Sequence, residues 1–379
     1  MNQTASTTSL ASSSNPSVVN QPVTFTATIS PQFGGTATGT VTFNDGANVL
    51  GTAAVTGNVA TFTIGSLSKG THSITAVYGG DTNVAGSSAS ALSQLVNPAP
   101  TTTAVTSSVN PSFANQATTF TATVTGQFGG TPTGTITFKS GTLSLGTITL
   151  SGGAASLNKT FTTSGTRSIT AVYSSDANFT GSTSPVLSQV VNAAPTSTAV
   201  TSNLNPSNYG DAVTFTATVT SAFGTPTGSV TFKAGNTTLG TANLSGGSAS
   251  LTTSALNTGT KSITATYKAT ANFAASTSPV YSQVVNRLNT TTALASSQNP
   301  SVAGQAVTFT ATVTTSFGTP TGSVTFKDGS TIIGTVALNG GTASLTTSSL
   351  SAGSHTIKAT LVQNGNYNGS TGSVVQQVN

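Results

Sequence analysis

The sequence predicts an all-β protein made of four tandem β-sandwiches of about seven strands each. Three observations predict it: a fourfold internal repeat, hydrophobic residues that alternate with a period of two, and turn residues that separate short segments without a convincing helix. The 379 residues include 40 Gly and 14 Pro. Only 4% of the residues are charged, against roughly 25% in ordinary soluble domains. Because β-branched residues and Phe recur at regular intervals, we still expect an ordered fold.

The repeat is visible in an Asn-Pro dipeptide that occurs four times, at intervals of 95, 95 and 94 residues. The four prolines are Pro16, Pro111, Pro206 and Pro300. A Phe nine residues further on keeps the same intervals. A unit of this length is long enough to bury its own core. The predicted domains are 6–97, 101–192, 196–286 and 290–379.

Within the first unit the strands follow one another in a simple order. The opening segment TTSLASSSNPS is followed by PVTFTATIS, whose inward residues are Val23, Phe25, Ala27 and Ile29, with threonines between them facing out. The next predicted strands are GTVTF, NVLGTAAV, VATFTI, HSITAVY and SALSQLV. Strict alternation of this kind indicates half-buried strands. Seven short antiparallel strands in about 95 residues indicate an immunoglobulin-like sandwich.

Turn and linker residues complete the pattern. Asp45-Gly46 and Asp328-Gly329 suit tight hairpins. We expect the Asn-Pro prolines to protect one sheet edge by removing a hydrogen-bond donor. The junctions VNPAPTTTAV, VNAAPTSTAV and VNRLNTTTAL leave only a few residues between sandwiches. If the domains lie in line, four of them reach on the order of 150 Å.

Several segments resemble the group 3 bacterial Ig-like repeats. These are VTFTATVT, FGTPTGSVTFKDGSTIIGT and LSAGSHTIKAT in the fourth unit and GTRSITAVYSSDANFTGSTSP in the second. The resemblance covers essentially the whole chain. It implies tandem modules of large exported or cell-surface proteins, typically the stalks of adhesins and of extracellular enzymes, and it carries no catalytic residues. A ligand site built on the Asp after the Tyr strand would fail in two units, because Asp81 and Asp176 correspond to Thr270 and Asn364.

Composition excludes several kinds of partner. The formal charge of +5 comes from ten Lys and Arg that form no cluster along the sequence, whereas nucleic-acid binding needs a basic patch. No apolar run approaches 18 residues, so we expect no membrane insertion. The start MNQTASTTSL is not a signal peptide, and we expect a fragment of a longer exported chain, with Met1 either native or added. Cysteine is absent, which excludes disulfides and thiolate metal sites.

We expect neither catalysis nor a cofactor. There is no Glu and there are only five Asp, so a carboxylate pair for glycoside hydrolysis is improbable. His72 and His355 share a position that holds Arg167 and Lys261 in the other units, which favours a solvated strand start over a metal or general-base site. The junctions contain no carboxylates for calcium. Lysines at the end of the GTVTF strand are expected to be solvated rather than crosslinked to Asn.

Two sets of aromatic residues are the candidate interdomain or ligand contacts. The first set precedes Gly in the loop between the second and third strands: Phe33, Phe128, Phe223 and Phe317. The second set follows Asn in the last hairpin loop: Phe179, Phe273 and Tyr367. In an immunoglobulin-like sandwich both loops lie where the chain enters the domain. These rings are therefore expected to pack against the preceding module. The alternatives are sugar stacking and loops that simply fold onto their own domain.

The sequence thus predicts a non-enzymatic, extracellular or cell-surface spacer whose partners are the neighbouring modules of its parent chain. Two alternatives stay open. One is a binding module for carbohydrate or another cell-surface ligand, with Phe33 at the free end. The other is a self-assembling fibre subunit. The outward Thr rows suit exposed strands and give little support to ice binding.

Overall fold

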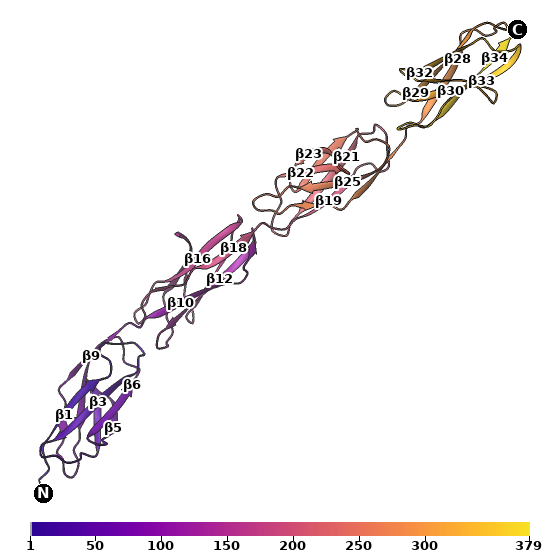
Figure 1. The fold of residues 1–379 in the computed structure, drawn as a ribbon. Helices are drawn as coiled ribbons and strands as arrows, with labels where there is room; N and C mark the ends of the chain where they lie inside the picture. Colours follow the sequence, from indigo (N-terminus) through magenta and orange to yellow (C-terminus); the bar gives the residue numbers. More distant parts are fainter. Residues whose placement is uncertain (1) are drawn as a thin grey trace. The chain divides into compact units, whose positions relative to one another are not determined.

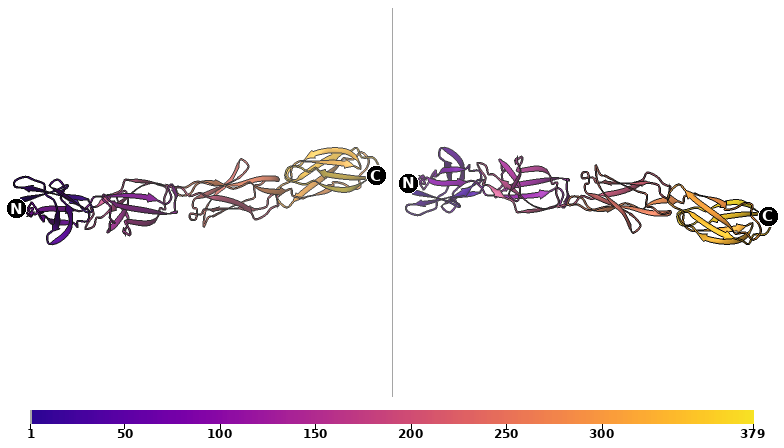
Figure 2. Two further views of the ribbon diagram at one scale, coloured as in Figure 1. Left: turned by 90° about the horizontal axis from the view of Figure 1, so that it is seen from below. Right: turned by 90° about the horizontal axis from the view of Figure 1, so that it is seen from above.

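The computed structural model describes residues 2–379, so Met1 lies outside the described residues. All regular elements among them are strands, and the predicted all-β class is confirmed. The chain divides into two compact units, residues 1–192 and 193–379, each holding two domains. Figure 1 colours the four domains in chain order, and Figure 2 gives two further views of the same strands.

The first unit contains eighteen strands, nine in each domain. Domain 1 comprises β1 (Ser6–Ser12), β2 (Ser17–Val18), β3 (Val23–Pro31), β4 (Thr40–Asp45), β5 (Asn48–Ala54), β6 (Val59–Ile64), β7 (Gly70–Tyr78), β8 (Ser87–Ser88) and β9 (Leu92–Asn97). Domain 2 comprises β10 (Thr101–Ser107), β11 (Ser112–Phe113), β12 (Ala117–Gly126), β13 (Thr135–Ser140), β14 (Leu143–Thr149), β15 (Ala154–Thr160), β16 (Gly165–Tyr173), β17 (Ser182–Thr183) and β18 (Leu187–Asn192).

The second unit contains sixteen strands. Domain 3 comprises β19 (Ser197–Ser202), β20 (Ser207–Asn208), β21 (Val213–Thr220), β22 (Ser229–Ala234), β23 (Thr237–Asn243), β24 (Ser248–Thr253), β25 (Gly259–Tyr267), β26 (Ser276–Thr277) and β27 (Tyr281–Asn286). Domain 4 comprises β28 (Thr290–Ser296), β29 (Val307–Thr315), β30 (Ser323–Asp328), β31 (Thr331–Ala337), β32 (Thr342–Thr347), β33 (Gly353–Leu361) and β34 (Ser370–Val378).

Each domain is a sandwich of two sheets. In domain 1 the smaller sheet has the order β1-β3-β6, and the larger has the order β2-β9-β7-β4-β5 with β8 beside β7. Domains 2 and 3 repeat this arrangement. In domain 4 the larger sheet has the order β31-β30-β33-β34, where one long strand replaces two shorter ones. The short pairs β2–β9, β11–β18 and β20–β27 are parallel, and the other strand pairs are antiparallel. Two packed layers of this kind are the immunoglobulin-like architecture.

The core follows the predicted alternation. Val23, Phe25, Ala27 and Ile29 are at most 1% exposed, whereas the threonines between them lie on the outer face. Tyr78 closes the same core from β7 and is also buried. Outward hydroxyls pair across the strands of the smaller sheet, as in the 2.8 Å contact between the Oγ1 atoms of Thr24 and Thr63. The Thr-rich face therefore satisfies part of its own hydrogen bonding.

Each Asn-Pro proline is exposed and lies directly before the residues at the edge of the larger sheet, which in domain 1 are those of β2. That the prolines protect this edge stays a prediction. Each follows a cis peptide bond at the point where the first strand leaves the smaller sheet and joins the larger one. Asn15 replaces a strand partner at this point: its Nδ2 donates to the Ser93 carbonyl at 2.7 Å, and its Oδ1 accepts from the Leu95 amide at 3.0 Å. The dipeptide thus changes sheets without leaving the edge of β9 unpaired.

A fully buried glutamine binds the segment in which the chain passes from the smaller sheet to the larger one. Gln94 is 0% exposed. Its Nε2 donates to the carbonyl of Ser14 at 2.9 Å and to the Ser17 hydroxyl at 3.1 Å. Its Oε1 accepts from the Ser12 hydroxyl at 2.7 Å. The corresponding glutamines are Gln189, Gln283 and Gln376, all equally buried. A buried side-chain amide is tolerated at this position because the segment between the two sheets supplies its hydrogen-bond partners.

The aspartates after the Tyr strand organise a loop. Asp176 accepts from the amide and hydroxyl of Thr133 at 2.7 and 2.8 Å, and from the amides of Asn178 and Phe179. Burial raises the pKa of Asp176, but these hydrogen bonds outweigh it and hold the pKa below the usual range. Asp81 accepts the equivalent hydrogen bonds in domain 1.

Domain 2 is expected to lose stability in acid through this one side chain, because Asp176 is the only carboxyl among residues 101–192. Its folded pKa is depressed, so its contribution is present above the ordinary Asp pKa and is lost as the pH falls through the folded pKa. Amide hydrogen exchange of domain 2 from pH 5 downward would measure the loss. In Asp176→Asn this pH dependence should disappear, and its persistence would contradict the assignment.

The predicted solvated position of the two histidines is wrong. His72 and His355 have side chains only 11% and 13% exposed, and each Nδ1 lies 2.6 Å from a carboxylate oxygen of Asp45 or Asp328. Each Nε2 lies 2.8 Å from the carbonyl four residues earlier. A protonated imidazole can donate to both partners, and the pKa of His72 and of His355 is raised. Burial alone would lower the pKa of His72, but its hydrogen bonds to Ser68 and Asp45 outweigh burial. Arg167 binds the equivalent carbonyl in domain 2. In domains 1, 2 and 4 this position thus holds a side chain that bonds to the carbonyl four residues earlier.

Candidate functional site: the junctions between neighbouring domains

The first aromatic set lies on the loop that follows the long strand of the smaller sheet. Phe33 in domain 1 is 81% exposed, Phe128 is 38% exposed and Phe317 is 46% exposed. Phe223 is half-buried. The loop lies at the upstream end of the domain, meaning the end at which the chain enters. In domain 1 the amide of Gln32 donates to the Ala5 carbonyl, and in domain 2 the amide of Gln127 donates to the Pro100 carbonyl. The four loops correspond in sequence, but the rings differ in exposure. Phe317, for example, contacts Tyr209 of the preceding domain.

The second aromatic set is buried. Phe179, Phe273 and Tyr367 are 5%, 6% and 6% exposed. Each pairs in a single parallel bridge with a linker residue just before its own domain. The linker partners are Ala99, Ala194 and Leu288. These rings therefore fix the chain as it enters the domain, and their faces are not open for stacking against a sugar.

Tyr209 connects domains 3 and 4 inside the second unit. It lies in the turn after β20 of domain 3, and its ring meets two rings of domain 4 edge to face. The centroid of Tyr209 is 5.8 Å from that of Phe317 and 5.8 Å from that of Tyr367. Burial, together with Tyr209, raises the pKa of Tyr367. Edge-to-face pairs at this spacing are a favourable aromatic geometry.

Hydrogen bonds join the same two domains beside the rings. The amide of Thr258 donates to Asn366 Oδ1 at 3.1 Å, and its hydroxyl donates to the Gly365 carbonyl at 3.0 Å. Arg287 Nε, in the linker, donates to that carbonyl at 3.0 Å. The last hairpin loop of domain 4 thus reaches back onto domain 3 at several points. A junction fixed by rings on one side and hydrogen bonds on another resists bending in more than one direction.

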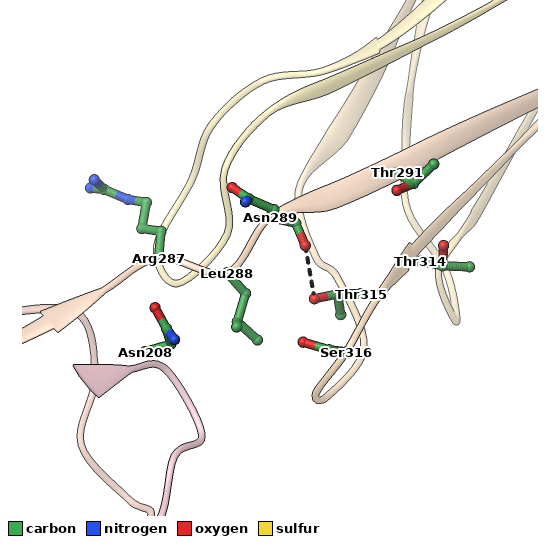
Figure 3. A pocket seen from close by; sticks show the side chains of 8 residues that line it. All are labelled: Asn208, Arg287, Leu288, Asn289, Thr291, Thr314, Thr315 and Ser316. Atoms are coloured by element: carbon green, nitrogen blue, oxygen red, sulfur yellow. Dashed lines mark hydrogen bonds between the residues drawn. The ribbon is translucent and has the colours of Figure 1, made fainter. Parts of the chain in front are cut away.

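The junction also borders two open surface pockets, the first of which is shown in Figure 3. The first pocket, of about 400 Å³, is lined by Asn208, by Leu288 and by hydroxyls of β29 and its following loop, including Ser316. The second pocket, of about 520 Å³, lies beside the linker and also reaches Arg287. The lining is amide and hydroxyl rather than carboxylate. Among residues 2–379 no group of three or more His, Cys, Asp or Glu is placed to hold a metal ion.

Domains 1 and 2 meet through a smaller contact in the first unit. Asn20, in the turn after β2, donates from Nδ2 to the Gly129 carbonyl at 3.2 Å. Gly130 lies between Asn20 and the ring of Phe179: a Cβ added there would approach Nδ2 within 2.5 Å and the ring within 2.8 Å. Gly130 has φ +86° as well, so both its conformation and its surroundings require glycine.

Sequence reasoning missed Tyr209 and Asn20, the two residues that reach from the preceding domain. Both lie in the turn that follows the Asn-Pro-Ser segment. A signal was present, because Tyr209 stands where the other units have Val19, Ala114 and Ala303. An aromatic residue in a turn position that is otherwise small points to a contact outside its own domain.

Four tandem immunoglobulin-like sandwiches, with side-chain contacts between domains 1 and 2 and between domains 3 and 4, define a modular, multidomain class of protein. The model of the bacterial Ig-like domain (group 3) matches residues 10–97, 103–192, 200–286 and 294–379, and the chain belongs to this family. No curated protein matches the chain. No helix in the described part of the chain is long and apolar enough to cross a membrane.

Solved structures with weak likeness include an adhesin, an ectodomain fragment and a set of fibronectin(III)-like modules. An Escherichia coli adhesin, FdeC, is 13% identical, with 73% of this chain and 96% of that chain covered and a TM-score of 0.28. The ICAM-5 D1-D4 ectodomain fragment is 13% identical, with 98% and 100% covered and a TM-score of 0.39. The fibronectin(III)-like modules of Clostridium thermocellum CbhA are 20% identical, with 47% and 94% covered and a TM-score of 0.21. Likeness at this level says nothing about what this chain binds.

Proposed function

We propose that the chain is a non-enzymatic spacer in an exported or cell-surface bacterial protein, and that the junctions within each unit set the angle between domains 1 and 2 and between domains 3 and 4. The observation that carries the proposal is the contact of Tyr209 with Phe317 and Tyr367 across the junction of domains 3 and 4. Linker residues paired with buried rings support it, because they leave few free residues between domains. The surface is rich in Thr and poor in charge, which limits non-specific ionic association.

The partners of such a spacer are the neighbouring domains of its own parent chain. Phe33 lies at the upstream end of domain 1, and its ring is 81% exposed. This exposure suits a ring that would pack against a neighbouring domain. The same ring favours a second candidate, an adhesin-like binding module for a surface glycan or another cell-surface ligand. A large exposed aromatic side chain is typical of an interaction site. Both candidates place the chain outside the cell.

Tyr209→Ala is expected to loosen the junction of domains 3 and 4. Two edge-to-face ring pairs contribute about 1–2 kcal/mol together beyond the area they bury. Residual dipolar couplings measured on the whole chain should report one common alignment for domains 3 and 4 in the natural sequence and separate alignments in the variant.

Tyr209→Phe is the matched control, because it keeps the ring and removes only the hydroxyl. It should preserve the common alignment. If the two domains already align independently in the natural sequence, the spacer proposal loses its mechanical basis. If Tyr209→Ala leaves the common alignment intact, the rings do not set the angle.

A further inference from the structure

Domain 4 brings two lysines together that are 31 positions apart in the sequence. Lys327 on β30 and Lys358 on β33 stand directly opposite each other in the antiparallel register, on strands labelled in Figure 1. Their neighbours Phe326 and Ala359 are fully buried, so both lysines project from the outer face of the larger sheet. The equivalent pairs in the other domains are Asn44–Thr75, Lys139–Thr170 and Lys233–Thr264.

No carboxylate compensates this pair. The adjacent Asp328 turns to the other face and binds His355 at 2.6 Å. The two ion pairs in the described part of the chain are both His–Asp pairs, and neither involves a lysine. Like charges directly opposite in a sheet are destabilising. Domain 4 therefore keeps an unfavourable arrangement that the other three domains avoid, which is typical of a site under functional constraint.

Hydroxyl groups flank the lysines on the same face. The lysine row continues to Ile332 on β31 and to Ser373 on β34. The next row along the strands consists of four threonines in register: Thr335, Thr325, Thr360 and Thr371. The two rows lie about 7 Å apart, and neighbouring strands about 4.8 Å apart. The face thus presents two cations and the exposed side chain of Ile332 beside a line of hydroxyls.

We propose that this face binds an acidic polysaccharide, with Lys327 and Lys358 pairing with its carboxylates and the threonine row hydrogen-bonding its hydroxyls. Ammonium groups interact with anions as compact point charges on flexible stems, and a polymer offers successive carboxylates to both lysines at once. A bound anion also removes the repulsion between the lysines. The inference does not depend on the spacer role, because it concerns one face of one domain.

The test is an NMR titration of the full chain at low ionic strength with an oligogalacturonate, a neutral dextran oligomer and inorganic phosphate. We expect the oligogalacturonate to shift the amide signals of β30 and β33, and added salt to weaken the effect. Lys358→Thr, which restores the pair found in domains 2 and 3, should weaken binding by about tenfold or more. It should also raise the thermal stability of domain 4 at low salt, which shows that the variant is folded.

Domain 3 offers matched controls, because it has the same four-threonine row but one lysine. Lys233→Thr should leave the oligogalacturonate affinity unchanged, and Thr264→Lys should create a second site in domain 3. The proposal is overturned if Lys358→Thr binds as well as the natural chain, or if the oligogalacturonate causes no shifts. It is also overturned if phosphate alone shifts these signals as strongly as the oligomer, since that response marks a simple ion site.

Discussion

Gln94→Met is expected to lower the free energy of unfolding of domain 1 by about 3 kcal/mol. The substitution keeps nearly the same volume, so the effect comes from hydrogen bonds rather than from a cavity. The side chain is 0% exposed, and its removal leaves the carbonyl of Ser14 and the hydroxyls of Ser12 and Ser17 without their present partner. Amide hydrogen exchange across β3 and β7 would measure the loss, with domains 3 and 4 as references in the same chain.

The same substitution at Gln189 provides a graded control. In domain 2 the Nε2 of Gln189 makes the corresponding bonds, but its Oε1 has no hydrogen-bond partner. Ser107 donates to the Val109 carbonyl, as Ser12 does to the Ser14 carbonyl, but unlike Ser12 it makes no bond to the glutamine. Because one buried acceptor is already unsatisfied, Gln189→Met should cost about 1 kcal/mol less than Gln94→Met. Equal losses in the two domains would show that the serine hydroxyl does not contribute as argued.

The sequence was sufficient for the features that depend on local pattern. Alternation placed Phe25 and Tyr78 in the core. Side chains of a strand point to its two faces in turn, so one face is buried as a set, and here the apolar set is the buried one. The fourfold repeat made each position testable against three others. Alternation and the repeat were also sufficient to predict the all-β class and the sandwich architecture.

The features that the sequence did not reveal depend on residues that meet across sheets or domains. His72 was misread because Asp45 lies 27 positions away, and only strand register brings the two together. For Tyr209 the sequence showed only an unusual residue type in a turn, and not its ring partners, which belong to the next domain. Lys327 and Lys358 formed no cluster along the chain for the same reason. Long-range pairing of polar groups has no periodic signature.

Thr118→Val is expected to stabilise domain 2, by about 1–2 kcal/mol. Thr118 is 1% exposed, and its hydroxyl has no hydrogen-bond partner. The equivalent residues Val23, Val213 and Val307 are equally buried and apolar. Valine has nearly the same shape as threonine and is also β-branched, so the substitution removes an unsatisfied polar group without creating a cavity or a strained rotamer. Slower amide exchange across β12 and β15 would report the gain.

The reverse substitution in domain 1 separates this explanation from a general preference for valine in strands. Val23→Thr would bury a hydroxyl at the same position of the sandwich, and domain 1 should lose about as much stability as domain 2 gains. Thr119→Val, one residue along on the outer face, should change stability far less, because that hydroxyl is exposed and bonds to Asn158. A stabilisation at Thr119 equal to that at Thr118 would assign the effect to strand propensity. A gain confined to Thr118 would assign it to the unsatisfied hydroxyl in the core.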